Sequence, residues 1–270
     1  MPKTKSRHER QLSTQDGNDS RKVTICRWVV EAVNGHIKTQ FRQLRNQYSN
    51  VAARKLKEEF RIACALLNAF GARFTDHVLV NQMVNEINLK QYAPNPLSET
   101  VIQNNLNLRR VQFQTIDAAI GLEDFPVLTK DDIIIKALGT YQIAQARSYY
   151  GEHIKRNGVY EIQVCRDDGG LFLENLWLLR AKIDSRHAGN RTYFVYILIN
   201  NGMQGRDKLE GHYCSCIVGK RTLGCCSHIM SVIWFLGWAR HQNVFPLPPA
   251  LFLDTIIVRH DVENEANDEF

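Results

Sequence analysis

The stretch YCSCIVGKRTLGCCSHIM, from Tyr213 to Met230, gathers four of the seven cysteines of the chain and one histidine. Cys214 and Cys216 are separated by one residue at the end of a predicted strand. Cys226 and His228 are separated by one residue where a helix begins. Side chains two positions apart on a strand point to the same side, so both sulfurs of the first pair can face the second pair. Thiolates and one imidazole suit tetrahedral zinc, and four protein ligands leave no open position. The spacing therefore predicts one structural Zn²⁺.

Two alternatives exist for these thiols. A disulfide fits poorly, because two adjacent cysteines cannot both pair in relaxed geometry with the other pair. The second alternative is that a cysteine serves as a small buried hydrophobic side chain. This alternative suits Cys26, Cys64 and Cys165, which lie within apolar-patterned segments. Cys225 could replace Cys226 as a ligand, although Cys226 keeps the one-residue spacing to His228.

Composition limits the class of protein and its partners. The chain has 270 residues and a formal net charge of +6, which mildly favours polyanionic partners and also fits simple solubility. The first 22 residues are polar and lack the apolar stretch of a signal peptide. The longest apolar run, residues 229–239, is shorter than the roughly 20 residues that span a bilayer. We expect a nuclear or otherwise intracellular protein with no membrane association. No phosphate-binding glycine loop is visible, so no small-molecule cofactor is expected.

Helical periodicity marks the first half of the chain. Apolar residues recur at three- and four-residue spacing and predict an amphipathic helix. A second helix is expected over residues 54–70, with a stop at Gly71, and a third from Asp76 as N-cap. Thr129 and Asp132 resemble a capping box at the start of a later helix. The apolar face of the first helix consists of Val30, Val33, Ile37, Phe41 and Leu44.

The second half of the chain changes to strand patterns. Segments 159–165, 176–183 and 192–199 are rich in β-branched and aromatic residues and are separated by turn-like sequences. They predict an antiparallel meander that a fourth strand at 212–216 could join, followed by an apolar helix over 228–241. The expected fold class is α+β. We expect a disordered tail (1–22), a helical segment (23–90), a connector (91–138), the meander with a zinc finger at about 211–240 (139–241) and an acidic tail (242–270).

The ligand spacing Cys-x-Cys, loop, Cys-x-His before an apolar helix resembles the SWIM zinc finger. That resemblance implies a ββα-type finger, zinc binding and contacts with DNA or proteins. It covers about 30 residues.

A longer resemblance involves RWVVEAVNGHIKTQFRQL, from Arg27 to Leu44, and EEFRIACALLNAF after it. These segments resemble the C-terminal end of Harbinger-like DDE transposases, whose last catalytic acid lies on such a helix. The resemblance implies that Glu31 is that acid, with Asn34, Gly35 and Lys38 matching the pattern, and that residues 23–90 are a remnant of an RNase H-like domain.

DDE chemistry needs three carboxylates that hold two divalent ions. In the family, two aspartates precede this helix on strands, whereas here only the polar segment 1–22 does. Asp16 and Asp19 lie there without a strand pattern. We therefore expect no enzyme, and Glu31 acting as an exposed helical acid. The alternative is a fragment of an active transposase or endonuclease, with the other acids missing from this chain.

Basic residues on the first two helices could contact phosphates, although Glu58 and Glu59 interrupt the run and a solvated surface explains it equally. The candidates for nucleic-acid contact are Lys38 and Arg42 on the first helix and Lys220 and Arg221 in the finger loop. The sequence thus predicts a transposase-derived, zinc-binding protein that binds DNA or protein without catalysis.

Overall fold

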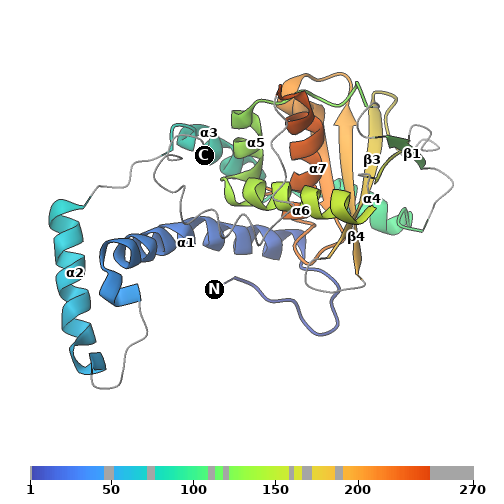
Figure 1. The fold of residues 1–270 in the computed structure, drawn as a ribbon. Helices are drawn as coiled ribbons and strands as arrows, with labels where there is room; N and C mark the ends of the chain where they lie inside the picture. The colour runs from blue at the N-terminus through green and yellow to red at the C-terminus, as the bar shows by residue number, and fades with distance from the viewer. Residues whose placement is uncertain are drawn as a thin grey trace.

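The computed structural model describes residues 2–45, 52–71, 77–108, 113–117, 122–157, 161–165, 172–185 and 191–243. Within these ranges the chain forms seven α-helices and one five-stranded antiparallel sheet (Figure 1). The predicted α+β class is therefore confirmed. No helix in these ranges is long and apolar enough to cross a membrane. The predicted helix start at Asp76 and nearly all of the acidic tail lie outside the described residues.

The sheet is a meander in which every strand pairs with its neighbour in the sequence. The four predicted strands are present, and a fifth strand, β1, precedes them. The early strand was missed because its four residues are too few to show alternation. The strands are β1 (Gln114–Asp117), β2 (Glu161–Cys165), β3 (Leu176–Asp184), β4 (Thr192–Asn200) and β5 (Leu209–Cys214).

Helices cover both faces of this sheet (Figure 1). On one face, α6 (Tyr141–Asn157) and α7 (Ser227–Gly237) enclose the larger core with alternate side chains of the strands, such as Leu179 and Ile197. On the other face, α4 (Pro96–Gln103) packs against β5, and Leu97 and Tyr196 belong to a second core. The alternation places successive strand side chains in different cores. The predicted apolar helix after the finger is thus confirmed as α7, and the short η4 (Ala239–His241) follows it.

The segment expected to be a connector is structured, which corrects the prediction for 91–138. It contains α4, β1 and α5 (Lys130–Ala137). Asn95 caps α4 through its side chain, and the Thr129–Asp132 capping box of α5 is confirmed. Residues such as Val101 (0% exposed) and Phe125 (1% exposed) are buried. The elements are short and their apolar residues are irregularly spaced, so packing stabilises them more than local periodicity does.

The beginning of the chain is also structured, which corrects the prediction of a disordered tail over 1–22. Helix α1 runs from Thr14 to Gln40, with Ser13 as its N-cap. Asn18 and Arg21 are buried although both are polar (0% and 7% exposed). Hydrogen bonds of Asn18 to the finger loop, and of Arg21 to the carbonyls of Ala137 and Leu138, replace the apolar contacts that usually mark an ordered segment.

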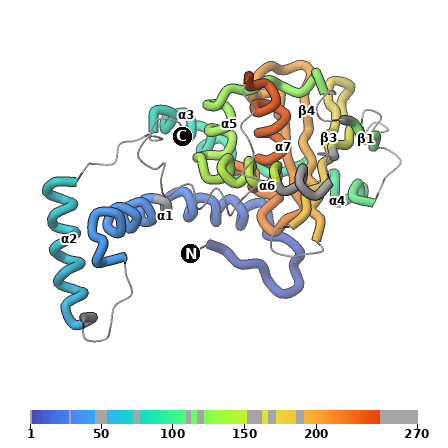
Figure 2. The backbone as a smooth tube through the Cα atoms, in the orientation of Figure 1, coloured from blue at the N-terminus to red at the C-terminus, as the bar shows by residue number. Residues whose placement is uncertain are grey.

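The C-terminal part of α1 extends away from the sheet and its covering helices, which we call the body, and forms an arm with α2 (Leu56–Phe70) (Figures 1 and 2). Two short 3₁₀ helices, η1 (Arg42–Arg45) and η2 (Ala52–Lys55), lie between them in the sequence. We define the arm as residues 24–71. Both helices were predicted, but most of their apolar face is not buried: Val30 and Val33 are 59% and 38% exposed, and Phe70 is 85% exposed.

Helix α3 (Val80–Lys90) connects the arm to the body, and η3 (Gly205–Lys208) precedes β5. Leu79, at the start of α3, is buried with Ile134 and Ile135 of α5 in a third, small core. The chain therefore returns from the arm to the body at α3.

Candidate metal centre

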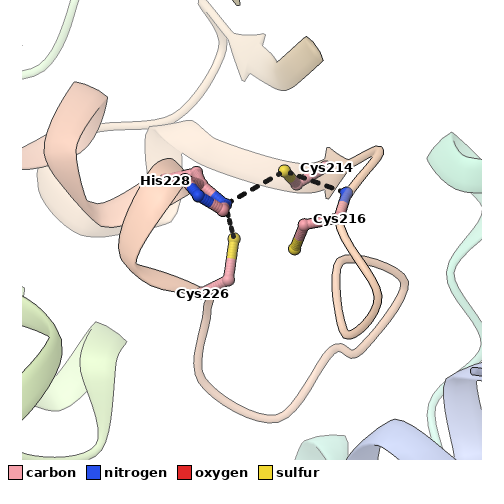
Figure 3. A group of neighbouring side chains, drawn as sticks. All are labelled: Cys214, Cys216, Cys226 and His228. Atoms are coloured by element: carbon pink, nitrogen blue, oxygen red, sulfur yellow. Dashed lines mark hydrogen bonds between the residues drawn. The ribbon is translucent and has the colours of Figure 1, made fainter. Parts of the chain in front are cut away.

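Four side chains of the predicted zinc site lie together between β5 and α7 (Figure 3). Cys214 is the last residue of β5, and Cys216 follows in the finger loop, which we define as residues 215–225. Cys226 is the N-cap of α7, and His228 lies in its first turn. The strand end and the helix start thus bring two ligand pairs to one point.

The distances fit one metal ion. The ligand atoms of the four residues all lie within 4.8 Å of one another. His228 Nδ1 is 3.8 Å from Cys214 Sγ and 3.9 Å from Cys226 Sγ. A tetrahedral zinc with ordinary bond lengths separates sulfur and nitrogen ligands by about 3.6 Å. The four side chains are at most 9% exposed. This group could hold one metal ion without a rearrangement of the backbone.

The first ligand pair lies in a tight turn. The amide of Cys216 donates to Cys214 Sγ at 3.4 Å, and the amide of Cys214 donates to the carbonyl of Gly219 at 3.1 Å. A Cβ on Gly219 would overlap the carbonyl of Cys214. Only glycine therefore allows the loop to fold back so closely on the ligand.

The electrostatics of the four side chains require a cation if all three thiols are to ionise. Burial raises the pKa of Cys214 well above its usual value. Burial opposes ionisation of Cys226 too, but hydrogen bonds from Cys214, Cys216 and His228 lower its pKa well below the usual value. Without a metal, one thiolate is favoured at the expense of the others. Three adjacent thiolates need a bound divalent cation.

The ring of His228 is fixed by aromatic neighbours. Tyr149 and Tyr193 lie with their ring centroids 4.9 Å and 4.6 Å from the imidazole. Nε2 is buried and has no hydrogen-bond partner among the described residues. Nδ1, which faces the sulfurs, is therefore the nitrogen placed to bind a metal.

Cys225 is buried but is not a member of the group (0% exposed). Burial raises its pKa to about 12. Of the two adjacent cysteines, the structure brings Cys226 to the site. Cys165 is buried as expected, Cys64 is half-buried, and the expectation is wrong for Cys26, which is exposed on α1.

Gln11 is a site residue that the sequence did not reveal. Its Nε2 donates to the carbonyls of Cys214 and Cys216, at 2.8 Å and 2.6 Å. A glutamine in a polar terminal segment carries no pattern that distinguishes it from a solvated residue. Its role follows only from the position of the N-terminal segment against the finger loop.

Within the described residues, Glu31 belongs to no group of acids that could hold a metal ion. It lies exposed on α1, and its carboxylate is 3.4 Å from the guanidinium of Arg27. Asp16 and Asp19 are on the same helix, where Asp16 accepts from Ser13 and Asp19 pairs with Lys22 at 2.8 Å. In this part of the chain, the group that could hold a metal ion is the one around Cys214.

The four candidates for nucleic-acid contact differ in exposure. Lys38 and Arg42 are exposed on the arm, and Lys220 is half-buried. Arg221 is 8% exposed, and its guanidinium donates to the carbonyl of Cys225. This corrects the expectation for Arg221, because a side chain that closes its own loop cannot reach a phosphate. Lys38 also lines an open cavity of about 440 Å³ between α1 and α2.

Comparison with known proteins gave no match to a family model, to a curated protein or to a solved structure. The geometry and chemistry of the four ligands are therefore what indicates a function.

Proposed function

We propose that this chain is a zinc-stabilised, non-catalytic binding protein whose finger resembles the SWIM type and whose helices 23–90 derive from a transposase. The observation that carries the proposal is the buried group of Cys214, Cys216, Cys226 and His228. Three thiolates and one imidazole are soft and borderline ligands, which favour zinc over magnesium or calcium. A nuclear location fits a role in nucleic-acid binding.

The zinc would be structural. Four protein ligands fill a tetrahedral shell, so no position remains for a substrate or an activated water. The ion would tie the end of β5 to the start of α7, and α7 is part of the larger core. Metal binding at such a site contributes directly to folding.

Elemental analysis of the purified chain tests this proposal. We expect about one zinc per chain, lost in Cys214→Ser and in His228→Ala together with the order of α7. Cys225→Ser is the matched control, because it removes a buried thiol next to the site and should retain the metal. Wild-type protein purified without stoichiometric zinc, and unable to take it up, would contradict the proposal.

The proposed binding surface for nucleic acid is the arm. Residues 24–71 contain eight basic and three acidic residues, a net charge of +5 in a chain of +6. Lys38 and Arg42 are exposed there, as are Arg45, Arg54, Lys55, Lys57 and Arg61. Phosphate contacts of this kind give affinity with little sequence preference.

A salt titration of binding to duplex DNA tests the arm. Each phosphate contact that is lost should reduce the slope of log K against log[salt] by about 0.9. We therefore expect Lys38→Gln combined with Arg42→Gln to reduce the slope by about 2, and Lys220→Gln to change it less. Binding that is negligible or insensitive to salt would rule out a phosphate-contacting arm.

A protein partner is the second candidate, and exposed apolar residues of α2 favour it. Ile62, Leu66 and Phe70 follow one another at four-residue spacing and are 59%, 42% and 85% exposed. Such a stripe suits an apolar helix or groove better than a phosphate backbone. Substitution of Ile62 and Leu66 by serine should abolish binding to a protein partner and leave the salt slope on DNA unchanged.

A further inference from the structure

Polar side chains of the N-terminal segment hold both ends of the finger loop. At the first ligand pair, the amide nitrogen of Gln11 donates to the carbonyls of Cys214 and Cys216, at 2.8 Å and 2.6 Å. The hydroxyl of Tyr213 donates to Gln11 Oε1 at 2.9 Å, so both ends of the amide are bonded. The backbone amide of Leu12 also donates to the carbonyl of Ile217, at 2.9 Å. These bonds hold the turn that carries the first two sulfurs.

Asn18 holds the far part of the same loop. It is fully buried (0% exposed). Its Oδ1 accepts from the backbone amides of Thr222 and Leu223, at 3.0 Å and 2.9 Å, and its Nδ2 donates to Thr222 Oγ1 at 2.9 Å. Thr222 and Leu223 lie just before the second ligand pair. One helix therefore positions the loop at a point between the two pairs of ligands.

The helix also packs closely on this loop. A Cβ added to Gly17 would lie 3.1 Å from the Cβ of Arg221. Gly17, Asn18 and Arg21 lie on one side of α1, because residues three and four apart share a helix face. This face of α1 has contacts with the loop that a larger side chain at position 17 would disturb.

Two buried arginines give an electrostatic reason for coupling. Arg21 and Arg221 are 7% and 8% exposed, and the Nε atom of each is buried without a hydrogen-bond partner in the described part of the chain. Neither belongs to an ion pair found there. A centre of three thiolates, one neutral imidazole and a divalent ion carries one net negative charge. A negative centre beside this loop would attract the two buried positive charges.

We propose that Gln11 and Asn18 are positioning residues of the metal module, so that metal binding and the docking of the start of α1 stabilise each other. The inference rests on the proposed metal function. Both processes need the same conformation of residues 215–225, and coupling of this kind is reciprocal. Because α1 is one continuous helix of 27 residues, about 40 Å long, fixing its first turns also fixes the direction of the basic arm.

A chelator competition on the full chain tests whether the docked N-terminal segment strengthens metal binding. Gln11→Glu keeps the size of the side chain and an acceptor for Tyr213 but removes the two donors to the ligand carbonyls. We expect about 10-fold weaker zinc binding. Gln15→Glu is the matched control: it makes the same substitution on an exposed residue of α1 that bonds Asp19, and it should leave affinity unchanged. Circular dichroism of the loaded variants checks that both are folded.

Hydrogen exchange of the full chain, with and without metal, tests whether metal binding stabilises the docking of the start of α1. On metal removal, residues 14–22 should exchange at least about 10-fold faster, as should the finger loop. The amides of α2 should change little, because the contacts described for α2 are mainly with α1 and η2. The visible spectrum of Co²⁺ bound to the thiolates should shift in Gln11→Glu and stay unchanged in Gln15→Glu, because only Gln11 bonds the ligand backbone.

Three outcomes would overturn the inference. Zinc affinity in Gln11→Glu equal to that of the wild type would show that the bonds to the ligand carbonyls do not position the site. Unchanged exchange of residues 14–22 on removal of stoichiometrically bound metal would show that α1 docks independently, while the zinc site itself stands. Failure of the wild-type chain to bind any metal would remove both this inference and the proposed function.

Discussion

The body and the arm of this molecule are built by the same chain on different physical principles. In the body, helices cover both faces of the sheet, and residues such as Trp234 and Ile197 are at most 2% exposed. In the arm, α1 and α2 are well-formed helices, and many of their large apolar side chains, such as Val30 and Phe70, are exposed, although Ile37 is buried. Helix formation follows from local sequence in the arm, whereas burial of an apolar face requires a second surface, which the body supplies. An exposed apolar face in a folded chain indicates an interaction surface.

The largest contrast should appear when one aromatic residue is removed from each region. Trp234 lies in the core against Tyr150, and Phe70 ends α2 in solvent. Trp234→Ala should lower the free energy of unfolding by about 3–5 kcal/mol. Phe70→Ala should change it by less than about 0.5 kcal/mol. Denaturant unfolding of both variants measures this, and a large effect at Phe70 would mean that the arm is covered in solution.

Buried charge should give the next largest effect. Burial lowers the pKa of Lys136 to about 8 from 10.5. Below about pH 8 the lysine is charged in both the folded and the unfolded state, so the folded state bears the full free-energy cost of a buried charge. As the pH rises towards 10.5, the folded state loses the proton while the unfolded state keeps it, and this cost disappears. Lys136→Met should therefore raise the free energy of unfolding by up to about 3 kcal/mol at pH 7.

The same substitution should bring almost no gain near pH 10.5. Lys57→Met on the exposed arm is the control, and it should show no such dependence on pH. A gain at Lys136 that persists at alkaline pH would mean that packing, and not charge, accounts for it.

Two glycines offer a test of backbone crowding. Gly219 folds against the carbonyl of Cys214, whereas a Cβ on Gly35 in α1 would meet nothing within 4 Å. Gly219→Ala should destabilise the body by about 1–3 kcal/mol and weaken metal binding. Gly35→Ala should stabilise the arm by about 0.5–1 kcal/mol, since alanine favours a helix interior. Thermal unfolding distinguishes the two, and a stabilising Gly219→Ala would contradict the geometry of the finger.

The smallest effect should belong to Glu31. Its ion pair with Arg27 is exposed and lies between residues four apart on α1. Glu31→Gln should change stability by less than about 0.5 kcal/mol. It should also leave metal content and DNA binding unchanged. Loss of a divalent-ion-dependent nuclease activity in this variant would instead support the transposase alternative.

Sequence patterns predicted the metal site and most of the sheet because their signals are local. The ligands occur as two close pairs, and β2, β3 and β4 are dense in β-branched and aromatic residues. The prediction was wrong for residues 91–138, where α4 and α5 have only eight residues each. Elements this short depend on contacts from elsewhere in the chain, which periodicity does not report.

The amino-acid sequence by itself determined which residues could bind a metal, because the spacing of thiols and imidazole fixes their chemistry and their direction on a strand and a helix start. It also determined the helices of the arm, through their apolar periodicity. Only the tertiary structure decided that Cys226 and not Cys225 faces His228, that Arg221 turns inward, and that Gln11 and Asn18 hold the finger loop. For Gln11 and Asn18, the physical reason is that their hydrogen bonds join segments some 200 residues apart, and polar contacts at that separation leave no pattern in the sequence. For Cys226 and Arg221 the contacts are local, but burial in the folded loop decides which way each side chain points.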